Sequence, residues 1–233
     1  MNNSVLVISD LHIPYHHQDA FEFLKALKKK YKPDLIVNIG DELDHHAISM
    51  HEHNPDLMSA GDELKQSKEY VKDLENIFPE MTLVHSNHSS LVYRRALKYG
   101  LPKDYLKSYN EFLGVGKGWA WVDDLTVTLS DGQRCFFTHG MAARALAVSM
   151  QFGCNVVQGH YHSKFSIEYF SNPDKLVWAM QTGCLINQKS MAFDYAKNFK
   201  SRFIVGCGMI IDGQPKLMPM VLDKDGRWNK MIP

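Results

Sequence analysis

The 233-residue sequence predicts an α/β protein in which two mixed β-sheets pack face to face with helices outside. Short β-branched apolar runs, typical of strands, end abruptly in polar residues. Between these runs, apolar residues recur at the spacing of a helix, and the last third of the chain is expected to be rich in strands. The clearest run is residues 35–44, Leu-Ile-Val-Asn-Ile-Gly-Asp-Glu-Leu-Asp. Its apolar part, bounded by Pro33, is typical of a central strand covered on both faces. Gly40 allows a sharp turn at the strand end, so Asp41 and Asp44 can project into one cleft.

The first half of the chain alternates strands with helices. We expect strands at residues 5–9 and 81–85 and helices at 18–31 and 61–78, with a further helix beginning near Leu91. Residues 28–30 are lysines at the carboxyl end of the first helix, where the helix dipole favours cations. Each strand is followed directly by polar residues of the kinds that bind metals.

The second half is predicted to be mostly strands. Residues 125–129 and 135–138 form a hairpin through Asp131-Gly132, and an apolar helix at 142–152 precedes a short strand at 155–158. The segment 101–121 favours a short helix followed by a glycine-containing loop, to which we assign no function. Four further strands are expected at 165–169, 176–179, 203–211 and 216–222, with Asp212-Gly213 as a hairpin turn.

Composition indicates an ordinary globular enzyme, which we expect to be one domain over residues 1–233. The 26 basic and 26 acidic residues give zero formal net charge, so no global field draws the chain to nucleic acid or membrane, although local patches can do so. The four cysteines are far apart and have apolar neighbours, as reduced core thiols do. The sequence has no signal-peptide pattern at its start and no apolar run of membrane-spanning length, so we expect a cytoplasmic protein.

Oxygen and nitrogen ligands gather at the predicted strand ends, which indicates a dinuclear metal site. Such donors suit Mn²⁺, Fe or Zn²⁺, and the lack of cysteine argues against a structural zinc site. Two carboxylates against two divalent ions leave a charge of about +2, which attracts phosphate. Two ions about 3.5–4 Å apart can stabilise both the attacking and the departing oxygen of an in-line displacement. The seven candidate ligands are Asp10, His12, Asp41, Asn87, His139, His160 and His162.

Each of these motifs alone is more often a helix cap or a polar core residue. Five of them in this order, each after a strand, are far more specific, and together they resemble the calcineurin-like metallophosphoesterase superfamily from residue 5 to about 165. The resemblance implies a four-layer sandwich of helices and two sheets. The motifs that carry it are Asp10-Leu-His12, Gly40-Asp-Glu-Leu-Asp44, Asn87-His88, His139-Gly140 and Gly159-His-Tyr-His162.

The resemblance also implies a role for each motif residue. Asp41 bridges two ions, and His88 is the acid near the leaving oxygen, oriented by Asp44. One ion is then held by Asp10, His12, Asp41 and His162, and the other by Asp41, Asn87, His139 and His160.

The sequence departs from the family pattern at three positions. Ser86 and Ser89 replace the usual Gly before the Asn-His pair and the Asp or Glu after it, so the hydrogen bonding of this turn must differ. His45 stands where the protein serine/threonine phosphatases of the family carry arginine, which argues against a phosphoprotein substrate. Substrate contacts must come from loops, and the candidates are Arg94, Arg95, Arg144 and the histidines His45, His46, His51 and His53.

Three functions are compatible with these residues. The first choice is a phosphodiesterase or nuclease that uses two divalent ions, Mn²⁺ before Fe or Zn²⁺, to hydrolyse nucleic acid or a nucleotide, loosely like the DNA-repair exonucleases of the superfamily. The second is a phosphomonoesterase for a small metabolite or a protein. The third is a metal-binding protein without useful turnover, because Ser86 and Ser89 depart from the family pattern. In the two enzymatic readings the partner is a phosphate ester, with DNA or a nucleotide preferred.

Overall fold

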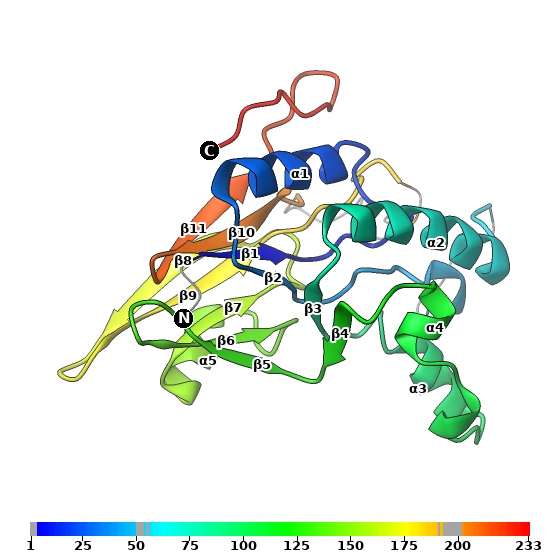
Figure 1. Cartoon of the computed structure of the whole chain (residues 1–233), viewed down its shortest axis with the longest axis horizontal. Coiled ribbons are helices and arrows are strands. Elements are labelled where there is room, and N and C mark those ends of the chain that lie inside the picture. Colours follow the sequence, from blue (N-terminus) through cyan, green and yellow to red (C-terminus); the bar gives the residue numbers. More distant parts are fainter. Residues whose placement is uncertain (1–3, 50–53, 55, 191, 193–201) are drawn as a thin grey trace.

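The computed structural model describes residues 4–49, 54, 56–190, 192 and 202–233. Two β-sheets lie face to face, and helices α1 (Ala20–Tyr31) and α2 (Ala60–Ile77) cover the outer face of one sheet (Figure 1). Helix α5 (Ala145–Phe152) covers the outer face of the other sheet. The four-layer sandwich predicted from the sequence is therefore confirmed.

The first sheet has six strands in the order β11-β10-β1-β2-β3-β4. Strands β1 to β4 run parallel to one another, whereas β10 and β11 are antiparallel to their neighbours. The strands are β1 (Ser4–Ile8), β2 (Leu35–Asn38), β3 (Met81–Val84), β4 (Trp119–Val122), β10 (Gly206–Ile211) and β11 (Gln214–Pro219).

The second sheet has five strands in the order β5-β6-β7-β9-β8. Its three central strands are parallel, and the edge strands β5 and β8 are antiparallel to their neighbours. The strands are β5 (Leu125–Thr128), β6 (Arg134–Thr138), β7 (Asn155–Gln158), β8 (Phe165–Ser171) and β9 (Leu176–Thr182).

Strand β1 shows how the layers are held together. Val5 and Val7 belong to the apolar core between the two sheets, while Leu6 and Ile8 pack in the core beneath α1 and α2. Successive side chains of a strand point to opposite faces, so a continuous apolar run is needed to fill both cores. This is the reason that β1 and β2 could be recognised in the sequence.

The carboxyl ends of the parallel strands meet at one edge of the sandwich. Within the first sheet, the backbone N–H of Asp10 donates to the carbonyl of Gly40 over 3.1 Å. Between the sheets, the ring Nδ1 of His139 lies 3.0 Å from the carbonyl oxygen of Ile39. In the second sheet, the N–H of Gly159 donates to the carbonyl of His139 over 2.9 Å. The loops after β1, β2, β6 and β7 are thereby tied together.

Two helices begin later than predicted, because other contacts use the residues before them. Helix α1 starts at Ala20 because Asp19 is its N-cap, and the Asp19 carboxylate accepts from the guanidinium of Arg227 at 2.5 and 2.8 Å. Helix α5 starts at Ala145 rather than at residue 142. The carbonyl of Ala142 accepts instead from the side-chain amide of Gln158, at 2.7 Å.

The segment 101–121 contains more structure than predicted. After α3 (Leu91–Lys98) come the 3₁₀ turn η2 (Lys103–Tyr105) and the helix α4 (Tyr109–Leu113), which begins with a Ser108–Glu111 capping box. The chain then forms β4, a strand that the sequence analysis did not predict. The remaining short element is the 3₁₀ turn η1 (His46–Ile48), which follows the β2 loop.

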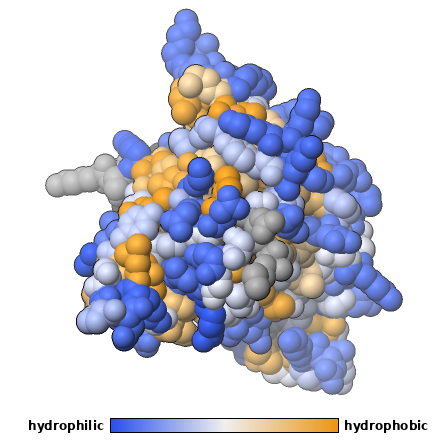
Figure 2. Space-filling view, turned by 60° about the vertical axis from the view of Figure 1, so that its left-hand side comes forward, coloured by the Kyte–Doolittle hydropathy of each residue, from blue (hydrophilic) through white to orange (hydrophobic). Residues whose placement is uncertain are grey.

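Among the described residues, none of the helices combines the length and the apolar character needed to cross a bilayer. The face in Figure 2 shows hydrophilic residues surrounding smaller hydrophobic patches.

Candidate metal centre

One group of donors lies at the end of β1 and in the loop after β7. The Nε2 atom of His162 is 3.0 Å from Oδ1 of Asp10, and Nε2 of His12 is 3.9 Å from the same oxygen. The N–H of His160 points at both oxygens of Asp10, at 3.2 and 3.0 Å. Burial by itself raises the pKa of Asp10, but the hydrogen bond and charge of His162 outweigh it, and the net pKa is lowered.

A second group comes from the ends of β2, β6 and β7. Nε2 of His139 is 3.1 Å from Oδ2 of Asp41, and Nδ1 of His160 is 3.2 Å from Nε2 of His139. Burial disfavours a charged His139, yet the adjacent Asp41 carboxylate raises the pKa of His139 to about 9. Burial by itself raises the pKa of Asp41, but the imidazoles of His139, His88 and His12 hold it well below its usual value.

Asp41 lies between the two groups. Its Oδ2 atom is 3.5 Å from Nε2 of His12 on one side and 3.1 Å from Nε2 of His139 on the other. Its Oδ1 atom accepts from the backbone N–H of His88 at 3.1 Å. This position fits the predicted bridging role.

The donor set fits divalent metal ions. Neighbouring donor atoms are 3.0 to 3.9 Å apart, close to the roughly 3–3.5 Å that two ligands show when each lies about 2.0–2.2 Å from one ion. In two of the histidines, the ring nitrogen that points away from Asp41 also has a partner. Nδ1 of His12 lies 2.6 Å from Asp44, and Nδ1 of His139 faces the Ile39 carbonyl. Such contacts orient histidine ligands in metalloproteins. Asn87, the remaining predicted ligand, is an exposed residue directly before His88.

Asp44 lies near three histidines: His46, whose Nδ1 is 3.6 Å from Oδ2 of Asp44, and His12 and His88, which it contacts in different ways. Its carboxylate lies against Nδ1 of His12, whereas its main-chain carbonyl contacts Nδ1 of His88. The carboxylate oxygen Oδ1 is 3.7 Å from that same His88 nitrogen. Burial lowers the pKa of His88, but the charges of Asp41 and Asp44 and the carbonyl contact raise it overall. Asp44 therefore positions His88 mainly through its backbone, a division of roles that sequence reasoning did not reveal.

Several site residues have left-handed backbone conformations, which are uncommon for residues other than glycine. Each such conformation costs on the order of 1–3 kcal/mol and persists where the surroundings fix it. No local sequence signal indicated them. The residues and their φ values are Asp10 at 51°, His12 at 49°, Asp41 at 50°, His45 at 54° and His160 at 66°.

The two unusual serines build the turn that supports Asp41. The Ser86 hydroxyl accepts from the N–H of Asp41 at 2.9 Å, and the Ser89 hydroxyl accepts from the N–H of Ser86 at 2.9 Å. Gly40 has a φ of 102°, and a Cβ at this position would lie 2.5 Å from Cβ of Ser86. The serine pair therefore closes the loop against the Gly40 backbone with hydroxyl groups.

The structure separates the three arginines proposed as substrate contacts. Arg94 is exposed beside the site, and its Nη1 donates to the carbonyl of Asn87 at 3.2 Å. Arg95 instead ties α3 to η1 by donating to the carbonyls of Ile48 and Ser49. Arg144 donates to Glu168 at 2.8 and 3.0 Å on the second sheet. Of the three, Arg94 is the one that lies beside the site and neither pairs with a carboxylate, as Arg144 does, nor links α3 to η1, as Arg95 does.

His45, a candidate substrate contact, lines a pocket. The pocket has a volume of about 240 Å³ and is lined by His45, Leu64, Val92 and Phe112 among others. Burial lowers the pKa of His45 to about 4, so its ring is neutral at pH 7. The backbone N–H of His46, the next residue, donates to the carboxylate of Glu63 in α2 at 2.8 Å. His51 and His53 lie outside the described residues.

A sandwich of two mixed sheets, with paired carboxylate and imidazole groups where the parallel strands end, defines the metallophosphoesterase class of fold. The sequence profile of the calcineurin-like phosphoesterases matches residues 4–182, and the chain belongs to this family.

Similar proteins span nearly the whole chain. The gene 54 protein of Mycobacterium phage L5 is 25% identical over 97% of this chain and 98% of its own length, and that of phage D29 is 24% identical over 95% of each. Vacuolar Protein Sorting 29 from Cryptosporidium parvum has a TM-score of 0.50 and 17% identity, covering 100% and 97% of the two chains. The Escherichia coli phosphoesterase Yfce has a TM-score of 0.50 and 16% identity, covering 96% and 95%. The solved structures support the fold alone.

Replacing Asp41 by asparagine should lower metal content and activity together, because it removes the negative charge that both donor groups share. Elemental analysis after dialysis against Mn²⁺ measures the first effect, and the melting temperature checks folding. Asp123→Asn, which changes a side chain that is 99% exposed, is the control. Retention of two equivalents of Mn²⁺ by the Asp41 variant would rule out the bridging role.

Metal affinity should rise with pH up to about 9. A coordinating imidazole must be neutral, whereas His139 of the metal-free protein has a pKa of about 9 and carries a proton at pH 7. Mn²⁺ binding at pH 7 should therefore release a proton, measurable by calorimetry in two buffers of different ionisation enthalpy. Binding without proton release at pH 7 would contradict the assignment of His139.

Proposed function

We propose that this chain is a metal-dependent phosphodiesterase that hydrolyses nucleic acid or a nucleotide. The observation that carries the proposal is His88, whose backbone N–H donates to Asp41 and whose ring Nδ1 contacts the Asp44 carbonyl, so that the imidazole is held beside the candidate ligands. An imidazole at this place suits a reaction whose leaving group needs a proton, as the alkoxide departing from a diester does. The proposed ligands are the seven residues predicted from the sequence, and Mn²⁺ is favoured because imidazole suits it better than Mg²⁺.

The protein contributes orientation and charge to this reaction. When bound, two divalent ions neutralise phosphoryl oxygens and make water a better nucleophile. Asp44 holds the His12 ring through Nδ1, and the Ile39 carbonyl holds the His139 ring in the same way, so both Nε2 atoms face Asp41. These preset orientations limit the rearrangement that the site needs during turnover.

The geometry also assigns the proton on His88. A carbonyl oxygen can only accept, so the contact with Asp44 places a hydrogen on Nδ1 of His88. The proton available to the leaving group is then on Nε2. The His88 and His12 rings meet edge to face at 4.7 Å between centroids, so the His88 ring lies next to the first donor group, which supports the proposed role.

Mn²⁺-supplemented assays on an aryl phosphodiester, the matching aryl monoester, and single- and double-stranded DNA test the proposal. We expect hydrolysis of the diester, with more rate from Mn²⁺ than from Mg²⁺, and none by Asp41→Asn. Activity confined to the monoester would identify a phosphomonoesterase instead.

His88→Gln should lower kcat for a diester with a poor leaving group by roughly 10²–10⁴-fold, with little change in KM or metal content. A substrate whose leaving group needs no protonation should lose much less. His85→Gln, in the same loop and beside exposed Asp123, is the matched control. Loss of one metal equivalent would make His88 a ligand, and a normal rate on the poor leaving group would contradict its role as an acid.

A further inference from the structure

Residues 93–107 form a projection that we call the α3–η2 lobe, at the lower right of Figure 1. Every residue from 97 to 105 is exposed, although several are large and apolar. Tyr99 and Tyr105 are 73% and 77% exposed, and Leu97 and Leu101 are 63% and 45% exposed. Apolar and aromatic side chains gathered in one exposed segment mark a surface that binds a partner.

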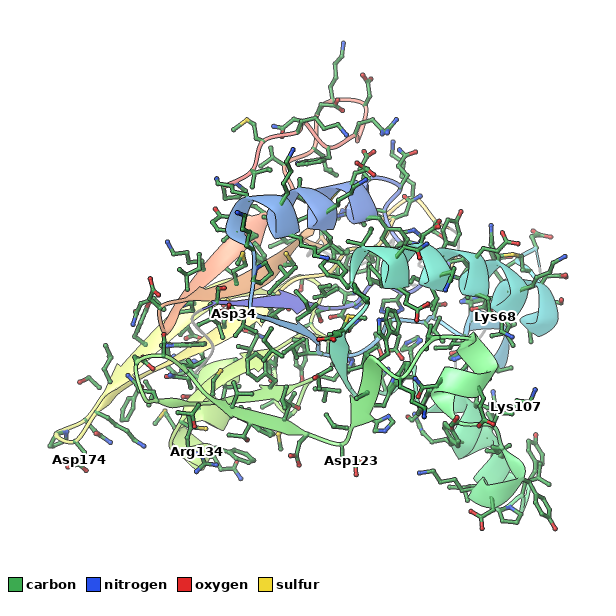
Figure 3. All side chains as sticks on the ribbon, in the orientation of Figure 1. Asp34, Lys68, Lys107, Asp123, Arg134 and Asp174 are labelled. Carbon is green, nitrogen blue, oxygen red and sulfur yellow. The ribbon has the colours of Figure 1, made fainter. Side chains whose placement is uncertain are left out.

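The lobe is strongly basic, although the whole chain has no net charge. It contains five basic residues and one acidic residue, Asp104. Three lysines, Lys98, Lys103 and Lys107, are exposed, and Figure 3 labels Lys107 at the outer side of this part of the molecule. A surface that binds a nucleic-acid strand needs cations to contact the phosphates and aromatic rings to stack on the bases. The basic side chains and exposed tyrosines of the lobe supply both.

Internal contacts make the lobe a defined surface. The hydroxyl of Tyr93 donates to the carbonyl of Lys107 at 2.8 Å, which ties α3 to the chain after η2. The Lys103 ammonium lies 5.6 Å from the centre of the Tyr93 ring. Tyr93 also packs edge to face on Tyr109 at 5.0 Å between centroids. Tyr93 is thus used within the protein, whereas Tyr99 and Tyr105 are left to the solvent.

The lobe is joined directly to the candidate metal centre. Helix α3 begins at Leu91, three residues after His88, and Arg94 donates to the Asn87 carbonyl at 3.2 Å. Its eight residues extend about 12 Å from the site. A short single-stranded segment can span this distance.

We propose that the α3–η2 lobe binds a single-stranded segment of a nucleic-acid substrate and guides its backbone to the metal centre. Tyr99 and Tyr105 stack on bases, and Lys98, Lys103 and Arg94 contact phosphates between the lobe and His88. A single strand is required because paired bases do not offer their faces to the tyrosine rings. This inference rests on the proposed function and adds its substrate class. The surplus of basic residues favours a nucleic acid over a protein partner.

The test measures binding of a fluorescent, phosphorothioate-linked oligothymidylate of about 12 nucleotides by anisotropy. Tyr99→Ala and Tyr105→Ala should each weaken binding by roughly 5–150-fold. Lys98→Ser and Lys103→Ser should weaken it and should each reduce the slope of log affinity against log salt by about 0.7. Tyr169→Ala, which removes a tyrosine that is 51% exposed on β8, should have no effect.

Hydrolysis of the small aryl diester separates the two proposals, because that substrate is too short to reach the lobe. Lobe variants should cleave it at the wild-type rate and melt at the wild-type temperature. A wild-type protein that fails to cleave it contradicts the proposed function. The lobe proposal is overturned if the wild-type protein cleaves the aryl diester normally but does not bind the oligonucleotide. It is also overturned if the lobe variants bind the oligonucleotide as tightly as the wild-type protein does. Concentration-dependent self-association abolished by Tyr99→Ala, without oligonucleotide binding, would make the lobe an interface between copies of this chain.

Discussion

Two carboxylates that repel each other are buried at the centre of the candidate site. Asp10 and Asp41 are 0% and 1% exposed at the edge where both sheets end, and like charges in such surroundings need compensating positive charge. His12, His139 and His162 lie against them, and the Asp41 carboxylate raises the pKa of His139 despite its burial, whereas burial lowers the pKa of His12. Divalent cations held between these groups would supply the compensating charge that the two carboxylates need.

The surrounding fold keeps this arrangement in place. The left-handed backbones at Asp10, His12, Asp41 and His160 are unfavourable in isolation, so the neighbouring contacts must hold them. Those contacts include the Ser86 hydroxyl on the Asp41 N–H and the Asp10 carboxylate on the His160 N–H. Two sheets with apolar cores on both faces supply the rigid frame on which the loops rest. The precision of the site therefore comes from the loops, and its rigidity comes from the strands.

Much of this arrangement follows from local sequence patterns. The apolar runs that form β1, β2 and β7 fill cores on both faces, so both the strands and the polar residues at their ends could be predicted. β4 was missed because Trp119–Val122 is short and directly follows three glycines spaced one residue apart. The attachment of the Asp44 carboxylate to His12, the burial of His45 and the pairing of Arg144 with Glu168 are contacts between distant segments, which composition and spacing do not encode.

The pairing of β1 with β10 affects how the chain folds while it is being synthesised. β1 lies between β2 and β10, and Val5 pairs with Ile210. Contacts that span so much sequence form slowly, because a long loop must close before they contribute. The first strand therefore completes its sheet only after the strand some two hundred residues later has been synthesised. Until then, one edge of a highly apolar strand is open to other partners, and a nascent chain of this topology is a natural client for molecular chaperones.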